Sequence, residues 1–133
     1  ILEMKWGLCA VSSGRVTLAR LTGFEIAQEF SWTGRQFSAQ EGCDFGVISR
    51  LEDEPVAAAQ ELARTVASQS PDAVAASNYL LNKTWQVGER RALLWERCVQ
   101  MRLLGRKNQR IAMQNGLQRD AEPKPFLDRT SFR

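Results

Sequence analysis

The stretch Thr33–Arg50, TGRQFSAQEGCDFGVISR, decides how this chain is organised, because it combines a turn, a capped helix and an extended run. Its first residues are typical of a turn. Ser38 followed by Glu41 forms the S-x-x-E capping box, in which the hydroxyl and the carboxylate each satisfy a backbone N–H that a helix start leaves free. Two glycines then keep the predicted helix short. Residues 47–52, VISRLE, are the best β-strand candidate, because they are rich in β-branched residues and bounded by glycine and an acidic turn.

On both sides of this stretch, apolar spacing and boundary residues predict further helices. Gly23 divides the apolar run before it into two short helices. Farther along, Ser70 is the expected N-cap of a helix with Pro71 in its first turn, and Asn108 is the expected cap of the last helix. The predicted helices lie within residues 17–30, 38–46, 53–66, 70–81, 88–104 and 108–119.

This inventory is mostly α-helical, with one or two short β-strands. A strand pair alone is marginal in water, so the pattern indicates part of an α/β protein whose main sheet lies outside these residues. The helix that begins near Pro55 is expected to bury one apolar stripe. The stripe consists of Val56, Ala59, Leu62, Ala63 and Val66.

Composition narrows the possible chemistry. The 133 residues carry 18 Lys and Arg against 15 Asp and Glu and contain no histidine, so acid–base chemistry must fall to carboxylates, Lys, Cys or Tyr79. Cys9, Cys43 and Cys98 lack C-x-x-C spacing, so we expect buried, reduced cysteines, no metal site and a cytoplasmic protein. No apolar run is long enough to span a membrane, and no run of like charge is typical of a nucleic-acid-binding arm.

Taken in order, several phrases resemble the C-terminal half of the crotonase family, the enoyl-CoA hydratases and isomerases. They are E-M-K-W-G-L, L-A-R-L-T-G, T-G-R-x-F-S-A-x-E-G-x-x-x-G-V-I-S-R, S-P-x-A-V and the closing K-P-F-L-D-R. The resemblance covers nearly the whole chain. It implies a spiral of ββα turns closed by a C-terminal helical region that builds a homotrimer or a dimer of trimers.

By this resemblance, residues 1–52 are the end of the spiral core and residues 53–133 are the helical trimerisation region and tail. Because the chain begins at Ile1 without Met, we expect an N-terminal half to be missing from it. That half would hold the oxyanion hole and most of the CoA-binding surface.

Glu3 falls where the resemblance places a catalytic glutamate, four residues ahead of Gly7. On the residues alone, a lone carboxylate is more often a solvated side chain or an ion-pair partner. In the family, such a carboxylate takes the α-proton of an acyl-CoA thioester or returns a proton to the enolate, while oxyanion-hole donors hold the thioester oxygen. The implied protein is a lyase or isomerase of fatty acid metabolism, with acyl-CoA as substrate and no bound cofactor.

Three more positions are implied to contact substrate. Val11 stands where isomerase-like relatives have an acidic residue and hydratases have glycine. A valine cannot transfer a proton and would crowd the water or acyl group, which leaves single-glutamate proton transfer or lost activity open. Phe126 matches an aromatic that reaches an acyl or CoA pocket, and Lys124 lies near a position that can meet a CoA phosphate. The alternatives are a tail anchor for Phe126 and a solvated charge for Lys124.

Two other functions stay open. One is a catalytically impaired assembly module, in which the helices after Glu54 trimerise and Glu3 is vestigial. The other is nucleic-acid binding through a basic cluster. No aromatic residues interleave with this cluster to provide stacking surfaces, which argues against that function. That cluster is Arg102, Arg106, Lys107 and Arg110.

Overall fold

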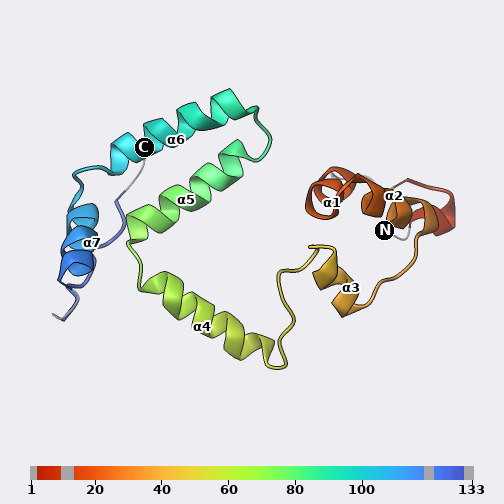
Figure 1. The fold of residues 1–133 in the computed structure, drawn as a ribbon, viewed down its shortest axis with the longest axis horizontal. Helices are drawn as coiled ribbons and strands as arrows, with labels where there is room; N and C mark the ends of the chain where they lie inside the picture. Colours follow the sequence, from red (N-terminus) through yellow and green to blue (C-terminus); the bar gives the residue numbers. More distant parts are fainter. Residues whose placement is uncertain (1–2, 10–13, 119–121, 131–133) are drawn as a thin grey trace. The chain divides into compact units, whose positions relative to one another are not determined.

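The computed structural model describes residues 3–9, 14–118 and 122–130, and these residues form helices with no β-strand (Figure 1). The chain divides into two compact units, Ile1–Ala58 and Ala59–Arg133. Among the described residues, no helix has the length and apolar character that crossing a membrane requires. The elements are η1 (Glu3–Trp6), α1 (Gly14–Thr22), α2 (Phe24–Thr33), α3 (Ala39–Asp44), α4 (Pro55–Ala67), α5 (Pro71–Thr84), α6 (Glu89–Leu103) and α7 (Lys107–Leu117).

In the first unit, α1 and α2 pack against each other and are separated at Gly23, as the sequence predicts. Gly23 has a φ of 85°, in the region that glycine adopts without a steric penalty. The core of this unit is Phe30, which is 2% exposed. Its ring lies 4.8 Å from that of Phe37 and 5.8 Å from that of Phe45.

The capping box of α3 is confirmed. The Glu41 N–H donates to the Ser38 hydroxyl at 3.1 Å, and the Ser38 N–H donates to the Glu41 carboxylate at 2.9 Å. Arg35 ties this helix start to the end of α2, because its guanidinium contacts Glu29 at 2.7 Å and Glu41 at 3.0 Å. The hydrogen bond from the Ser38 backbone and the bond from Arg35 hold the pKa of Glu41 below its usual value.

The β-strand predicted at residues 47–52 is wrong, because these residues form bends and irregular backbone. The N–H groups of Val47 and Ile48 both donate to the Gly42 carbonyl, at 2.8 and 3.1 Å. Gly46 has a φ of 76°, which turns the chain back onto the end of α3. Donors that a strand would offer to a neighbour are therefore used to close the helix.

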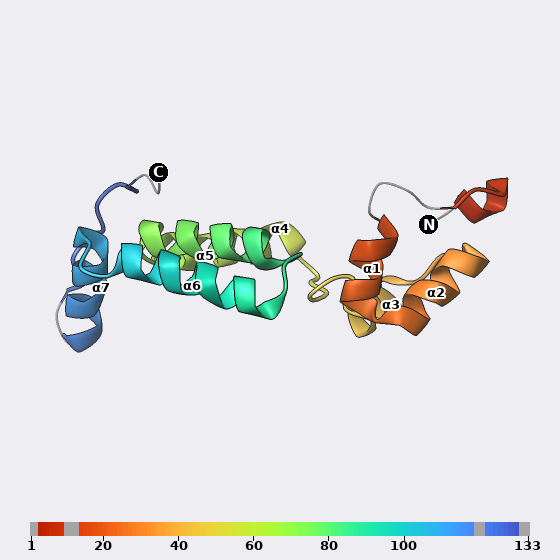
Figure 2. The same cartoon turned by 90° about the horizontal axis from the view of Figure 1, so that it is seen from above.

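In the second unit, α5 and α6 form an antiparallel pair, side by side in both views (Figures 1 and 2). Ala76 of α5 and Val99 of α6 are its buried apolar residues, at 2% and 3% exposure. Ser70 caps α5 as predicted, since its hydroxyl accepts the Ala73 N–H at 3.4 Å. Cys98 is exposed, contrary to expectation, because Val99 is the residue of α6 that the pair buries.

Two further expectations about helices are wrong. The apolar stripe of α4 is exposed, with Val56 at 69% and Leu62 at 54%, since no described part of the chain covers that face. The last helix is α7, whose N-cap is Arg106, so Asn108 is not its cap. Asn108 is the second residue of the helix and is 1% exposed, and its side-chain amide bonds to Asp72 and Leu127.

Candidate functional site

Glu3, the predicted catalytic carboxylate, opens the 3₁₀ helix η1. Its carbonyl accepts the Leu8 N–H at 3.1 Å, and the Gly7 N–H donates to the Met4 carbonyl at 3.0 Å. The side chain is half-buried. Among the described residues its carboxylate has neither a hydrogen bond nor an ion pair. Within the described part of the chain, the Glu3 carboxylate therefore makes no polar contact that stabilises the fold.

The other predicted site residues lie elsewhere. Val11 is outside the described residues. Lys124 and Phe126 lie in residues 122–130, here called the tail, which belongs to the second unit and has no regular secondary structure. Glu3 belongs to the first unit. Each unit is therefore considered by itself.

Asn115 of α7 holds the tail at Lys124 through both polar groups of its side-chain amide. The Lys124 N–H donates to Asn115 Oδ1 at 2.9 Å, and Asn115 Nδ2 donates to the Lys124 carbonyl at 3.0 Å. The pair imitates one rung of a β-ladder, with a side chain in place of one strand. Both bonds go to the backbone, so the Lys124 side chain is left free of this contact.

Asn108 repeats this arrangement at Leu127. The Leu127 N–H donates to Asn108 Oδ1 at 2.8 Å, and Asn108 Nδ2 donates to the Leu127 carbonyl at 3.1 Å. The same Nδ2 also donates to Oδ2 of Asp72, at the start of α5, at 3.1 Å. Asn108 thus joins α5, α7 and the tail.

Asp72 holds the end of the tail and is 2% exposed. Its Oδ1 accepts the backbone N–H of Thr130 at 2.8 Å and the Thr130 hydroxyl at 3.0 Å. Arg106 donates to the same hydroxyl at 2.6 Å. Burial acts to raise the pKa of Asp72, but the bonds from Thr130 and Asn108 and the charge of Arg106 outweigh it and hold that pKa below its usual value.

The three contacts recur every third residue of the tail, at Lys124, Leu127 and Thr130. A polyproline-type extended chain rises about 3.1 Å per residue, so three residues cover about 9 Å. Asn108 and Asn115 are seven residues apart on α7, which at 1.5 Å per residue is about 10.5 Å. The two spacings are close enough for one face of α7 to bind the tail at both Lys124 and Leu127, while Asp72 of α5 makes the third contact, at Thr130.

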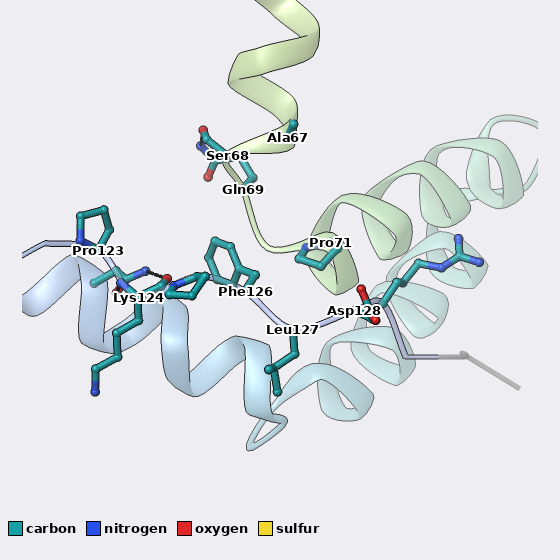
Figure 3. A pocket seen from close by; sticks show the side chains of 12 residues that line it. Ala67, Ser68, Gln69, Pro71, Pro123, Lys124, Phe126, Leu127 and Asp128 are labelled. Carbon is teal, nitrogen blue, oxygen red and sulfur yellow. Dashed lines mark hydrogen bonds between the residues drawn. The ribbon is translucent and has the colours of Figure 1, made fainter.

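Phe126 is half-buried and lines a cavity of about 520 Å³ between the tail and the turn that joins α4 to α5. Figure 3 shows its ring on the side of the tail that faces Ser68 and Gln69, with the side chains of Lys124 and Leu127 on the other side. The ammonium group of Lys124 is exposed, and its hydrogen-bond partner is the neutral Gln114 amide, at 3.1 Å. The described residues include no cluster of His, Cys, Asp or Glu suited to a metal ion.

The family model described as Enoyl-CoA hydratase/isomerase matches residues 1–127. The chain belongs to the enoyl-CoA hydratase/isomerase family. Carnitinyl-CoA dehydratase of Salmonella heidelberg (strain SL476) is 33% identical over 84 residues, which are 62% of this chain and 32% of that protein. The curated relatives are therefore matched over about a third of their length.

Solved structures show the same fold. An enoyl-CoA hydratase from Bacillus anthracis matches with a TM-score of 0.85 and 24% identity, over 94% of this chain and 48% of that chain. A probable enoyl-CoA hydratase/isomerase from Mycobacterium abscessus matches with a TM-score of 0.83 and 23% identity, over 96% of this chain and 50% of that chain. The chain spans about half of each of these structures, and its described residues match them with helices and no β-strand.

Sequence reasoning missed the residues that hold the tail, namely Asp72, Asn108 and Asn115. One signal was present, because two asparagines seven residues apart lie on one face of a helix, and the tail after that helix contains Pro123 and Pro125. Proline favours an extended backbone, and an extended chain has N–H and C=O groups that a side-chain amide can satisfy. Arg106, which the sequence grouped with a basic cluster, is bonded to Thr130.

Proposed function

We propose that the intact protein acts on an acyl-CoA thioester and that Glu3 transfers the proton. The family match carries this proposal, because it spans residues 1–127 and so includes Glu3. The carboxylate would take the proton from the carbon next to the thioester, or return a proton to the enolate. Donors of an oxyanion hole would hold the enolate oxygen meanwhile.

The local structure of Glu3 is compatible with this role. The half-buried carboxylate has no hydrogen bond or ion pair within the described residues, so it is available to meet a substrate. The oxyanion hole and most of the CoA surface would come from the half of the family fold that this chain does not span. The described part of this chain would supply the carboxylate, the helices and the tail.

The remaining predicted contacts form part of the same proposal. Lys124 would meet a CoA phosphate, since its ammonium is exposed and paired with a neutral amide. Phe126 would line an acyl or CoA pocket. Val11 would border the acyl group and cannot act as a second acid, so among the residues of this chain the proton transfer would fall to Glu3. The free cysteines fit a reducing compartment, the cytoplasm.

Substitution of Glu3 tests the proposal. In the intact protein, Glu3→Gln should lower kcat on crotonyl-CoA by about 10²–10⁴-fold, the usual contribution of a general acid or base. Binding of CoA, measured by calorimetry, should stay nearly unchanged. The matched control is Glu25→Gln, an exposed glutamate in the first turn of α2, which should keep full activity. Full activity of the Glu3 variant would refute the assignment.

An assembly role is the second candidate, and the exposed stripe of α4 favours it. Val56, Leu62 and Val66 are 69%, 54% and 43% exposed, which is costly for apolar side chains on one helix face unless a partner covers them. We propose a homotrimer or a dimer of trimers as that partner. Sedimentation mass and crotonyl-CoA turnover of the intact protein separate the two functions: an inactive trimer supports assembly alone, and an active one supports the enzyme.

A further inference from the structure

We propose that Asn115 and Asn108 are positioning residues that fix the register of the tail and so present Lys124 and Phe126 to acyl-CoA. The inference rests on the proposed function, because it takes Lys124 and Phe126 as substrate contacts. It assigns a role to two side-chain amides that bond to the backbone of the tail.

The first support is that both asparagines bond to backbone groups of the tail and not to its side chains. Asn115 binds both the N–H and the carbonyl of Lys124, and Asn108 binds both groups of Leu127. Each asparagine amide therefore fixes one residue of the tail and leaves the side chain of that tail residue free to make other contacts. The Lys124 ammonium stays exposed and opposed by no carboxylate in the described part of the chain.

The second support is that the tail sequence disfavours a slip of one residue at Asn115. Lys124 has a proline on each side, Pro123 and Pro125. Proline has no N–H, so a slip of one residue in either direction would place a residue without a donor opposite Asn115 Oδ1. The hydrogen bond of 2.9 Å exists in the observed register and is lost in both neighbouring ones.

The third support is the consequence of a slip. In an extended chain, a shift of one residue moves every side chain by about 3 Å and changes the side of the chain on which it lies. Lys124 would then leave its present side of the tail, and Phe126 would leave the cavity beside Ser68 and Gln69 (Figure 3). Hydrogen bonds at Asn115 and Asn108, on either side of Phe126, prevent this.

Amide exchange and CoA affinity in the intact protein test the inference. In Asn115→Ala, the Lys124 amide should exchange at least tenfold faster, while the Leu127 amide stays protected by Asn108. The affinity for coenzyme A should fall about tenfold, as for the loss of one charge-assisted bond. The control is Asn82→Ala, an exposed asparagine whose side chain bonds, among the described residues, to Asn78 of its own helix. It should change neither quantity.

A double-mutant cycle shows whether Asn115 acts through Lys124. Lys124→Ala should also weaken CoA binding about tenfold, and the double variant should bind no more weakly than Lys124→Ala alone. Additive losses, unchanged affinity in Asn115→Ala, unchanged exchange at Lys124, or no CoA binding by the unsubstituted protein would each overturn the inference. Crotonyl-CoA turnover is read separately: absent turnover with the expected binding pattern overturns the proposed function and leaves the positioning role supported.

Discussion

Replacing Asn108 by aspartate tests how the buried contact between α5, α7 and the tail is stabilised. The substitution Asn108→Asp keeps the shape of the side chain and one oxygen that accepts the Leu127 N–H. It removes the Nδ2 donor, which serves both the Leu127 carbonyl and the Asp72 carboxylate. It also places a second carboxyl group about 3 Å from that of Asp72, where the donor now lies 3.1 Å away.

The size of the loss follows from these bonds. The neutral bond to Leu127 is worth about 1 kcal/mol and the bond to the Asp72 carboxylate about 2 kcal/mol. These two losses apply if both carboxyl groups are ionised. If the introduced carboxyl and that of Asp72 instead share one proton at pH 7, keeping a carboxyl of ordinary pKa near 3.9 protonated costs about 4 kcal/mol. The free energy of unfolding should therefore fall by about 3–5 kcal/mol at pH 7.

The way the free energy of unfolding changes with pH distinguishes a pair that shares a proton from a pair that has only lost hydrogen bonds. The folded variant has a carboxyl whose pKa is raised, so its stability declines as pH rises from about 4 towards 7, by up to about 1.4 kcal/mol per unit. In the unsubstituted protein the pKa of Asp72 is lowered. Its contribution is present above the ordinary pKa and is lost only as pH falls through the lowered one, so it stays constant from pH 5 to 7. If the two carboxyl groups share one proton, the deficit of the variant should therefore shrink from about 5 kcal/mol at pH 7 to about 2.5 kcal/mol at pH 5, where about 1 kcal/mol of each value is the lost Leu127 bond.

Urea unfolding at pH 5, 6 and 7, followed by circular dichroism, measures this deficit. The control is Asn82→Asp, which adds a carboxylate to the exposed face of α5 and should shift the free energy of unfolding by less than about 0.5 kcal/mol at every pH. An Asn108→Asp deficit that is the same at pH 5 and pH 7, or that is no larger than the control's, would refute the proton-sharing argument.

The remaining predictions concern the first unit. Ser38→Ala should lower the free energy of unfolding by about 1 kcal/mol in urea titrations, because the Glu41 N–H loses its acceptor; Ser49→Ala, at an exposed bend, should have no such effect. Phe30→Ala should cost about 3–5 kcal/mol in the same titration, because the ring is 2% exposed between two other phenylalanines. Phe24→Ala, at 72% exposure, should cost under about 1 kcal/mol, and equal losses at the two positions would contradict the assigned core.

Local motifs were predictable from the sequence because their partners are close along the chain. Gly23 separates two helices by its own backbone conformation, and Ser38 bonds to a residue three positions away. The strand expected at residues 47–52 failed for a related reason. Its β-branched residues indicate a strand, but Gly42 and Gly46 allow the chain to close α3 with the same N–H groups. Strand propensity does not decide when a helix end offers acceptors nearby.

Features set by distant partners were not predictable in this way. The stripe of α4 has the correct spacing for burial, but spacing does not say which polypeptide covers it. The substrate contacts of Val11, Lys124 and Phe126 stay predictions, as does the catalytic role of Glu3. The resemblance supplied these assignments, because an isolated glutamate or lysine carries no signal of its own about substrate.

Asn108 shows what chemical reasoning could still recover. The sequence places it at a helix start, where asparagine is a common cap, yet its partners are 36 and 19 residues away. A buried carboxylate such as Asp72 only accepts hydrogen bonds, so its neighbours must donate, whereas the Leu127 peptide group needs one donor and one acceptor. Asparagine provides both functions within one short side chain. Aspartate supplies a donor there only by keeping a proton, which costs about 4 kcal/mol at pH 7, and leucine lacks both groups. The residue type at this position is therefore determined by the tail that follows α7 and not by the helix start beside it.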